Sequence, residues 1–566
     1  MASIFVIYLY ITFLAFIYGK LALKLLKAEI TSFPELPLAA GLCFLTVYAQ
    51  FFSLIHKVGL LANLILAAGA VLLLIRNRNC LRQNFSVRTL LIFLGLLVVF
   101  SYASSRGIMH YDSDLYHAQS IRWIEEYGAV KGLANLHTRL GYNSASFALT
   151  ALFSFAFLGK GSFHVCAGYF AVLTAFACFD NFHFFRKHRI CAADFARLGA
   201  LYYLFIIFDE IVSPASDYFS MLLVFYLSIR LLDAAEGEIT VNELIPFAFL
   251  SVYLVSIKLS AAPMIILAVL PGALLIRQRD FKRLAGCLLT GTVIIAPYLI
   301  RNVILSGWLL YPSVFPDLFD VPWKLPREEA VYDANEIGSY GRGLSGAVQE
   351  KVPLSAWIGP WFQKAGAAEK LMIILSFACL LAGLMLAAVY LLIRIRKKKA
   401  AVFWEFATGK CARISLISGL MLSFTLWFYS APMIRYGYSF LILIPLISIG
   451  TAAEAVLTKC SERCRFTAAR AFSAAAVLFL LFKTTTLIRE QQFYVERPYY
   501  LTQQDYGSYS VLEAQIDGVT IYYPEAGDQA GYQPFPAAAA YPQVELLGEN
   551  VGDGFKRKPS ADDISR

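Results

Sequence analysis

Apolar runs of about twenty residues recur along the whole chain, separated by short polar segments. Such a run, as a helix, crosses the hydrocarbon core of a bilayer, which is roughly 30 Å thick. The residue-by-residue alternation of an outer-membrane barrel is absent from these runs. We therefore predict an all-α polytopic membrane protein with about fourteen transmembrane helices. The predicted spans are 2–19, 36–55, 58–75, 89–105, 162–182, 195–212, 218–234, 243–258, 259–276, 284–303, 369–393, 412–430, 436–457 and 467–487.

Basic residues indicate how these spans are oriented. Clusters of Lys and Arg lie within 20–27, 76–88, 186–189, 277–283, 394–399 and 459–465. Each cluster follows an odd-numbered span, so all of them are cytoplasmic if both chain termini lie outside. The acidic stretch 233–243 is the exception, since the same layout makes it cytoplasmic.

This layout requires that the apolar stretch 144–158 does not cross the membrane. Its length of about 15 residues is also short for a span. We predict a helix that lies in, or dips into, the outer interface, and we expect a tag at Lys160 to be reachable from outside.

The layout divides the chain into six regions. They are the N-terminal spans (1–105), a first outer loop with surface helices (106–161), a transmembrane core (162–303), a second large outer loop (304–368), the C-terminal spans (369–487) and a small extracytoplasmic region (488–566). The last region contains a strand-like segment at 518–523.

Composition agrees with this class of protein and excludes another. The 566 residues are 58% hydrophobic and 16% charged, with a mean hydropathy of +0.61, whereas soluble domains carry roughly 25% charged residues. The net charge of +10 arises in short loops and not in a separate basic domain, so we expect no nucleic-acid partner.

The first outer loop holds the most informative stretch, which runs from His110 to Gly128. Asp114 is a natural N-cap for the helix that follows, and an apolar stripe at helical spacing (Leu115, Ala118, Ile121, Ile124 and Tyr127) predicts an amphipathic helix on the membrane surface. Gly128 ends it.

At that depth Asp112 is placed to act as a general base toward a hydroxyl group. The bland alternative is that Asp112 and Asp114 form only a turn and a cap. Polar residues cluster in the same loop and favour a functional role: His110, Tyr116, His117, His137, Arg139 and Asn143.

Further candidates lie in other outer segments. Asp209 and Asp217 flank a short loop, although Asp217 also suits an N-cap. Lys258, Arg301 and Arg435 are cations on the side where cations are rare, which makes them candidate phosphate ligands. The alternative for all three is snorkelling or a structural ion pair.

The stretch Asp112-Ser-Asp-Leu-Tyr116 resembles the first outer loop of the GT-C class of membrane glycosyltransferases, which includes protein O-mannosyltransferases and aminoarabinose transferases. Their pattern is D-E-x-x-Y followed by a surface helix that ends near Gly. Here Ser113 replaces the second acid, and Asp114 supplies an acid one position later. The chain also resembles a set of uncharacterised bacterial membrane proteins with similar loops. The resemblance covers roughly residues 105–300.

The resemblance implies a bacterial plasma-membrane enzyme whose site faces outward. The donor would be a sugar on a polyprenyl phosphate, and the acceptor a glycan, lipid or protein. It implies Asp112 and Asp114 as catalytic residues, and Arg435, Arg301, Lys258, Tyr116, His117, Arg139, Asn143, Asp209 and Asp217 as substrate-binding residues. Some members use a divalent metal, which Asp114 or Asp209 would support; no cofactor is assigned. Two other functions remain open: a polysaccharide polymerase or ligase, and a lipid-linked sugar transporter.

Overall fold

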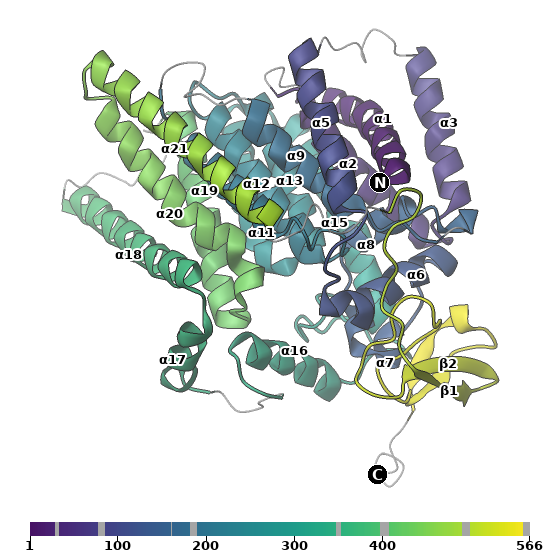
Figure 1. Ribbon diagram of the computed structural model, residues 1–566. Coiled ribbons are helices and arrows are strands. Elements are labelled where there is room, and N and C mark those ends of the chain that lie inside the picture. Colours follow the sequence, from purple (N-terminus) through teal and green to yellow (C-terminus); the bar gives the residue numbers. More distant parts are fainter. Residues whose placement is uncertain are drawn as a thin grey trace.

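The computed structural model describes residues 1–28, 33–76, 85–159, 161–180, 189–346, 352–396, 407–489 and 499–558. Helices dominate it, and two small antiparallel sheets lie near the C-terminus (Figure 1). Some features used above fall outside the described residues, namely the tag position Lys160 and the basic residues Arg78, Arg82, Arg186, Lys187, Lys397, Lys398 and Lys399.

Each predicted span coincides with helical structure. The helices are α1 (Ala2–Leu25), α2 (Leu36–Ser53), α3 (Leu60–Arg76), α5 (Val87–Ala103), α9 (Cys166–Asp180), α11 (Ala192–Ile206), α12 (Ser216–Ala234), α13 (Val241–Ile257), η4 (Leu259–Ala268) with α14 (Val269–Arg277), α15 (Phe281–Ser306), α18 (Ala367–Arg396), α19 (Thr408–Ser430), α20 (Ile434–Leu457) and α21 (Glu462–Arg489). The irregular one, η4, is a 3-10 helix that contains Pro263, which lacks the N–H of a regular helical bond.

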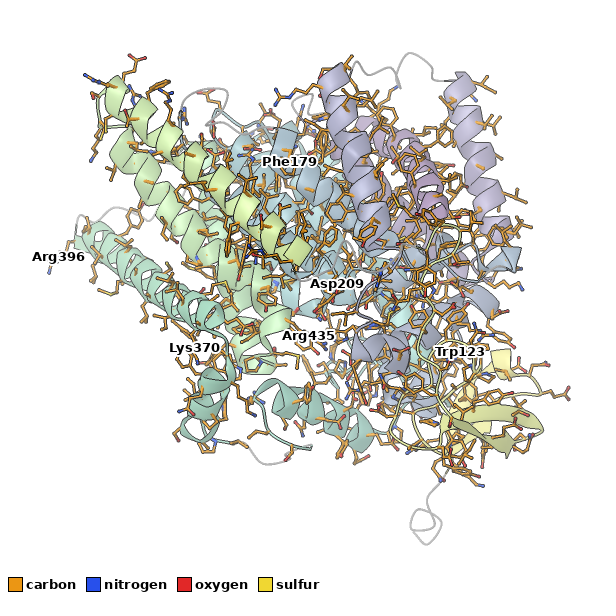
Figure 2. The ribbon with its side chains drawn as sticks, viewed as in Figure 1. Trp123, Phe179, Asp209, Lys370, Arg396 and Arg435 are labelled. Atoms are coloured by element: carbon orange, nitrogen blue, oxygen red, sulfur yellow. The ribbon has the colours of Figure 1, made fainter. Side chains whose placement is uncertain are left out.

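Eight helices in the described residues are long and apolar enough to cross a membrane. The protein is therefore an all-α membrane protein in its main body. α18 is an example: it carries no charged residue from Leu371 to Ile393, and Figure 2 labels Lys370 and Arg396 near its two ends. Four more predicted spans coincide with shorter apolar helices: α3, α5, α13 and most of α9.

Contacts between helix ends show that successive helices alternate in direction. The start of α1 meets the end of α5 and the segment before α9, because Tyr8 Oη lies 2.8 Å from Ser104 Oγ and donates to the Val165 carbonyl at 3.0 Å. The ends of α2 and α15 meet in the same way through Ser53 and Arg301. Helix ends that the charge pattern predicts to share a side therefore do lie together.

Two ends of the helical body follow from these contacts. The loop end carries the segments 106–159, 307–346, 352–366 and 499–558, and Figure 1 shows its elements α6, α7, α16, α17, β1 and β2 together at the bottom of the view. The opposite end carries the turn between α20 and α21.

An ionic network is buried at the opposite end. Arg230 Nε donates to Glu35 Oε1 at 2.6 Å, Arg197 Nη2 donates to Asp233 Oδ1 at 2.6 Å, and Arg197 Nη1 donates to Asp194 Oδ1 at 3.0 Å. Asp233 begins the acidic stretch that disagreed with the charge pattern. Its carboxylate is neutralised within the protein, and the orientation rule counts Lys and Arg, not net charge.

Short helices build the loop end. They are η1 (Ser113–His117), α6 (Ala118–Glu126), α7 (Leu133–Leu136), η2 (Thr138–Gly141), α8 (Ala145–Leu152), η3 (Ala156–Leu158), α16 (Arg327–Gly341) and α17 (Leu354–Lys364). The stretch predicted not to cross is thus broken into α8 and η3. With eight residues α8 is too short for a span, and all of its residues are buried beside α2 and α6 instead of facing lipid.

Residues 499–558 form a small unit that we call the C-terminal module. β1 (Val511–Ile516) and β2 (Val519–Pro524) make a hairpin, and β3 (Val544–Leu546) pairs with β4 (Phe555–Arg557) near the 3-10 helix η6 (Val551–Asp553). The predicted strand at 518–523 corresponds to β2. Asp517 and Gly518 both have positive φ, as a tight hairpin turn requires.

The C-terminal module covers α6. Trp123 is buried, and its ring centroid lies 4.8 Å from that of Phe535 and 5.8 Å from that of Phe555 (Figure 2 labels Trp123 beside the module). Arg122 Nη1 donates to the carbonyls of Tyr532 and Gln533 at 2.5 and 2.6 Å. The predicted helix is present, and protein covers most of it, because the module packs on the side that carries Arg122 and Trp123. Its position on the membrane surface stays a prediction.

Candidate functional site

The loop that carries Asp112 is fixed to the turn between α11 and α12. Ile108 N–H donates to the Asp209 carbonyl at 2.6 Å, and His110 N–H donates to Ser213 Oγ at 2.7 Å. At Gly107, φ is +152°, and a Cβ there would lie 2.0 Å from the Asp209 carbonyl oxygen. Only glycine lets the two loops approach this closely.

Asp112 forms an ion pair with Arg435, which lies 323 residues further along the chain in the first turn of α20. Arg435 Nη2 donates to Asp112 Oδ2 at 2.5 Å and to Tyr436 Oη at 3.0 Å. The two side chains remain 18% and 27% exposed. Figure 2 labels Arg435 at the lower end of α20, so the pair belongs to the loop end.

A second cation joins the pair. Lys258 follows α13 and forms an ion pair with Asp217 in the first turn of α12. Its Nζ lies 4.1 Å from the centroid of the Tyr436 ring, and the Arg435 guanidinium carbon lies 4.9 Å from the same centroid. One aromatic ring therefore holds two positive charges close together, which creates a natural position for an anion.

Burial and charge act on Asp112 in opposite directions. Burial raises the pKa of this carboxyl, but the charge of Arg435, followed by smaller effects of His117, of His110 and of the hydrogen bond from Arg435, outweighs burial and holds the pKa below its ordinary value. Asp112 is therefore ionised at neutral pH. Burial, together with the charge of Arg435, lowers the pKa of His110 to about 4, so this imidazole is neutral.

Tyr116 and His117 lie beside the ion pair. The His117 ring is buried 4.4 Å from the Tyr116 ring, and its Nδ1 lies 3.1 Å from Ser113 Oγ. Burial lowers the pKa of His117 to about 3, which makes it neutral as well. The structure thus gathers Asp112, Arg435, Lys258, Asp217, Tyr116 and His117, and we call this group, with His110 and Tyr436, the loop-end site.

Arg301 and Asn143 form a separate buried pair. Arg301 Nε donates to Asn143 Oδ1 at 3.1 Å, and Nη1 donates to Ser53 Oγ at 2.5 Å. Asn143 Nδ2 in turn donates to the Tyr298 carbonyl at 2.9 Å. These bonds tie α15 to α2 and to the start of α8, so the guanidinium is engaged in helix packing and not in the loop-end site.

Arg139 is also engaged elsewhere. Its Nη2 lies 2.7 Å from Glu336 Oε2, and its Nε lies 3.5 Å from Asp333 Oδ1, both on α16. Tyr142 donates to the same Asp333 carboxylate. This arrangement attaches α16 to η2 and gives Arg139 a structural partner in place of the predicted substrate.

Asp114 is bonded to the C-terminal module. Its Oδ1 accepts from Gly507 N–H at 2.8 Å, and its carbonyl accepts from Gly531 N–H at 2.9 Å. Its predicted role as N-cap was wrong, because the residue before η1 is Asp112. Its catalytic role stays a prediction, and in this structure its carboxylate anchors the module.

The described residues contain no group of three or more His, Cys, Asp or Glu side chains arranged to hold a metal ion. Asp114 is bonded to the module, and the contact of Asp209 with the Asp112 loop is made by its backbone carbonyl. These residues do not form a metal-ligand set, and no step is assigned to a metal.

Sequence reasoning missed one residue of the site and a buried cluster outside it. Tyr436 directly follows Arg435, and an aromatic residue beside an unexpected cation was an available signal. The cluster lies next to the module: Ser162 Oγ donates to Glu125 Oε1 at 2.7 Å and lies 2.8 Å from His164 Nε2, while Tyr532 donates to Glu125 Oε2 at 2.7 Å. No local pattern joins these residues.

A comparison with known protein families shows to which family this chain belongs. Residues 1–442 match the family described as a domain of unknown function, DUF8201. The chain belongs to the DUF8201 family. No curated protein matches it. The match includes the first turn of α20, so the DUF8201 region contains every residue of the loop-end site, while the C-terminal module lies beyond it.

Proposed function

We propose that this protein is a GT-C-like glycosyltransferase of fourteen spans that transfers a sugar from a polyprenyl-phosphate donor to an acceptor outside the cytoplasm. The observation that carries the proposal is the loop-end site. A carboxylate, two cations and an aromatic ring from three distant segments converge where the helical body meets the polar loops. A donor with an oily chain, a phosphate and a sugar requires such a boundary.

In the proposed reaction Asp112 is the general base. Its carboxylate takes the proton of the acceptor hydroxyl as the oxygen forms a bond to the anomeric carbon. The bond from that carbon to the phosphate oxygen breaks, and the electron pair leaves with the polyprenyl phosphate. Attack opposite the leaving group inverts the configuration at the anomeric carbon.

Arg435 and Lys258 are the proposed phosphate ligands. Negative charge grows on the leaving phosphate during the reaction, and preorganised cations stabilise that growth most effectively in a water-poor site. Both cations contact Tyr436, so their separation is set before the donor arrives. Arg301 and Arg139 are left out of this role because their bonds lie outside the loop-end site, to Asn143 and to Glu336.

The test replaces Asp112 with Asn and follows labelled sugar from the lipid donor into membrane acceptors. Loss of a general base lowers the rate by about 100- to 10,000-fold. Asp320→Asn, which alters an exposed carboxylate in the loop before α16, is the matched control and should transfer at the wild-type rate.

Transfer by a correctly inserted Asp112→Asn protein would remove Asp112 as the base. If the wild-type protein transfers no sugar but moves labelled donor across the membrane, the transporter reading replaces the transferase.

A further inference from the structure

The cation best placed to bind the donor phosphate is already occupied. Arg435 Nη2 is bonded to Asp112, the residue proposed as the base. Asp112 cannot serve fully as the ion-pair partner of Arg435 and as the general base at the same time. A carboxylate held by a guanidinium is a weaker proton acceptor, because the positive charge stabilises the ionised form. The structure therefore shows a resting arrangement in which neither residue is free to perform its proposed task.

The geometry offers Arg435 a second attachment that is independent of Asp112. Arg435 Nη1 lies 3.2 Å from His110 Nδ1, and the backbone N–H of Asp112 donates to the same nitrogen at 3.1 Å. One nitrogen that meets two donors must be an unprotonated acceptor. A neutral His110 with its proton on Nε2 fits this requirement.

His110 is itself firmly placed. Its backbone N–H is bonded to Ser213 Oγ, and its side chain is 18% exposed. Arg435 Nε makes no hydrogen bond with the described residues. The guanidinium is therefore held on its Nη1 side by His110, while its remaining donors can turn toward a new acceptor.

We propose that the donor phosphate takes the place of Asp112 on Arg435 while His110 keeps hold of the guanidinium, so that the donor must bind before the acceptor can be deprotonated. His110 is then a positioning residue and Arg435 has two successive partners. This inference rests on the proposed function.

The exchange changes the strength of the base. The charged and titratable groups that face Asp112 are Arg435, His110, His117, Lys258, Tyr111 and Tyr116. Among the groups that stabilise the ionised carboxylate, the charge of Arg435 has the largest effect. Once Arg435 turns to the phosphate, burial acts on Asp112 with less opposition and its pKa rises toward that of a useful base.

The experiment measures the protonation of Asp112 directly in the purified full-length protein. A hydrophobic carbodiimide modifies protonated carboxyl groups, and peptide mass spectrometry quantifies the product at Asp112 across a pH series. Undecaprenyl phosphate, which carries no sugar, is the probe, and its binding is measured separately by native mass spectrometry. We expect it to raise the midpoint of labelling by about one pH unit or more.

Two variants sharpen the result. Arg435→Gln should have a raised midpoint that the lipid no longer moves. His110→Gln retains an acceptor for Arg435 and should keep most of the lipid-induced shift, whereas His110→Leu should lose it and should need more donor for half-maximal transfer with a smaller change in the maximal rate.

The outcomes separate the two proposals. If the lipid binds and the wild-type midpoint stays in place, the exchange is wrong, while the transferase proposal stands. If the lipid does not bind at all, both fall. Should a variant fail to fold, the wild-type midpoint with and without lipid still decides.

Discussion

Two ionic clusters lie at opposite ends of this protein, and they differ in how completely their charges are satisfied. In the opposite-end network Arg197 and Arg230 are 0% exposed, and Arg197 donates to two carboxylates. At the loop-end site the four charged side chains are 12–27% exposed, and each cation has one carboxylate partner. The charges of the opposite-end network are thus enclosed by protein partners, and we call it the closed network. The charges of the loop-end site have fewer partners and stay partly accessible to solvent.

This difference in exposure and pairing suggests how to distinguish charged residues that stabilise the fold from charged residues that bind a ligand. A fully buried guanidinium is tolerated only when carboxylates surround it, and removing one partner leaves a charge stranded in a poor solvent. A partly exposed pair contributes less stability, because water competes for both partners. Weak pairing lets a ligand replace a protein partner at small cost. The loop-end site thus gives up stability that the opposite-end network retains.

The largest effect on stability is expected from Arg197→Ala. It removes the guanidinium that pairs with Asp194 and one of the two guanidinium groups that pair with Asp233, at a cost of about 3–5 kcal/mol. Detergent-solubilised protein should unfold at a clearly lower temperature, or fail to accumulate in membranes. The exposed Arg465→Ala is the control, with a change within about 0.5 kcal/mol. Equal stability of the two variants would contradict the idea of a closed network.

Arg435→Gln should separate stability from function. Loss of the partly exposed ion pair between Arg435 and Asp112 costs about 0–1 kcal/mol of folding free energy. Loss of a charge-assisted bond to phosphate costs about 1.5–3 kcal/mol of donor binding, which is roughly 10- to 150-fold in affinity. Thermal unfolding and titration with undecaprenyl phosphate measure the two quantities. A large loss of stability with unchanged lipid affinity would place Arg435 with the structural arginines.

The pH dependence of transfer follows from the lowered pKa of Asp112. At donor concentrations far below saturation the rate reports the protein without donor, in which Arg435 keeps Asp112 ionised as pH falls, so the acid limb of that rate should lie below the ordinary aspartate value of about 4. Below that limb the rate should drop about tenfold per pH unit, because the base is protonated. In Arg435→Gln the limb should move to higher pH. Rates of sugar transfer in buffers from pH 3 to 8 provide the measurement, and an unmoved limb would argue against the pairing.

The smallest effect on function is expected from Arg139→Gln. This residue is bound to Asp333 and Glu336 on α16, so it should behave like a structural arginine despite its place in the first outer loop. The expected loss is about 1 kcal/mol of stability, because the side chain is 23% exposed. The concentration of donor at half-maximal rate should stay constant, and a clear rise would return Arg139 to the substrate site.

Local pattern was enough to predict much of the architecture. Hydrophobic length marks a helix wherever lipid is the solvent, and basic loops indicate direction, so the spans and their alternation could be read from residues 2–487. The β2 strand and the helix end at Gly128 are also local. At Gly128, φ is +88° and a Cβ would lie 2.5 Å from the Ser53 carbonyl oxygen, which explains why glycine stands there.

The sequence did not reveal which residues the polar side chains would bond to in the fold. Asp114, Arg139 and Arg301 all looked like site residues, because polarity in an apolar chain is conspicuous whatever its cause. Their partners are Gly507, Glu336 and Asn143, each more than 150 residues away. Likewise, the stripe on α6 correctly indicated a helix but could not reveal that a distant module would cover its other face.

By itself the sequence determined that this chain forms helices suited to a membrane, in which order they alternate, and that Asp112 and Arg435 are chemically unusual for their surroundings. Only the tertiary structure decided that these two residues meet, since a carboxylate and a guanidinium 323 residues apart become neighbours through the packing of α5, α12, α13 and α20. The physical reason is range: hydrophobic length and loop charge act along the chain, whereas ion pairs act across space and depend on which helix ends come together.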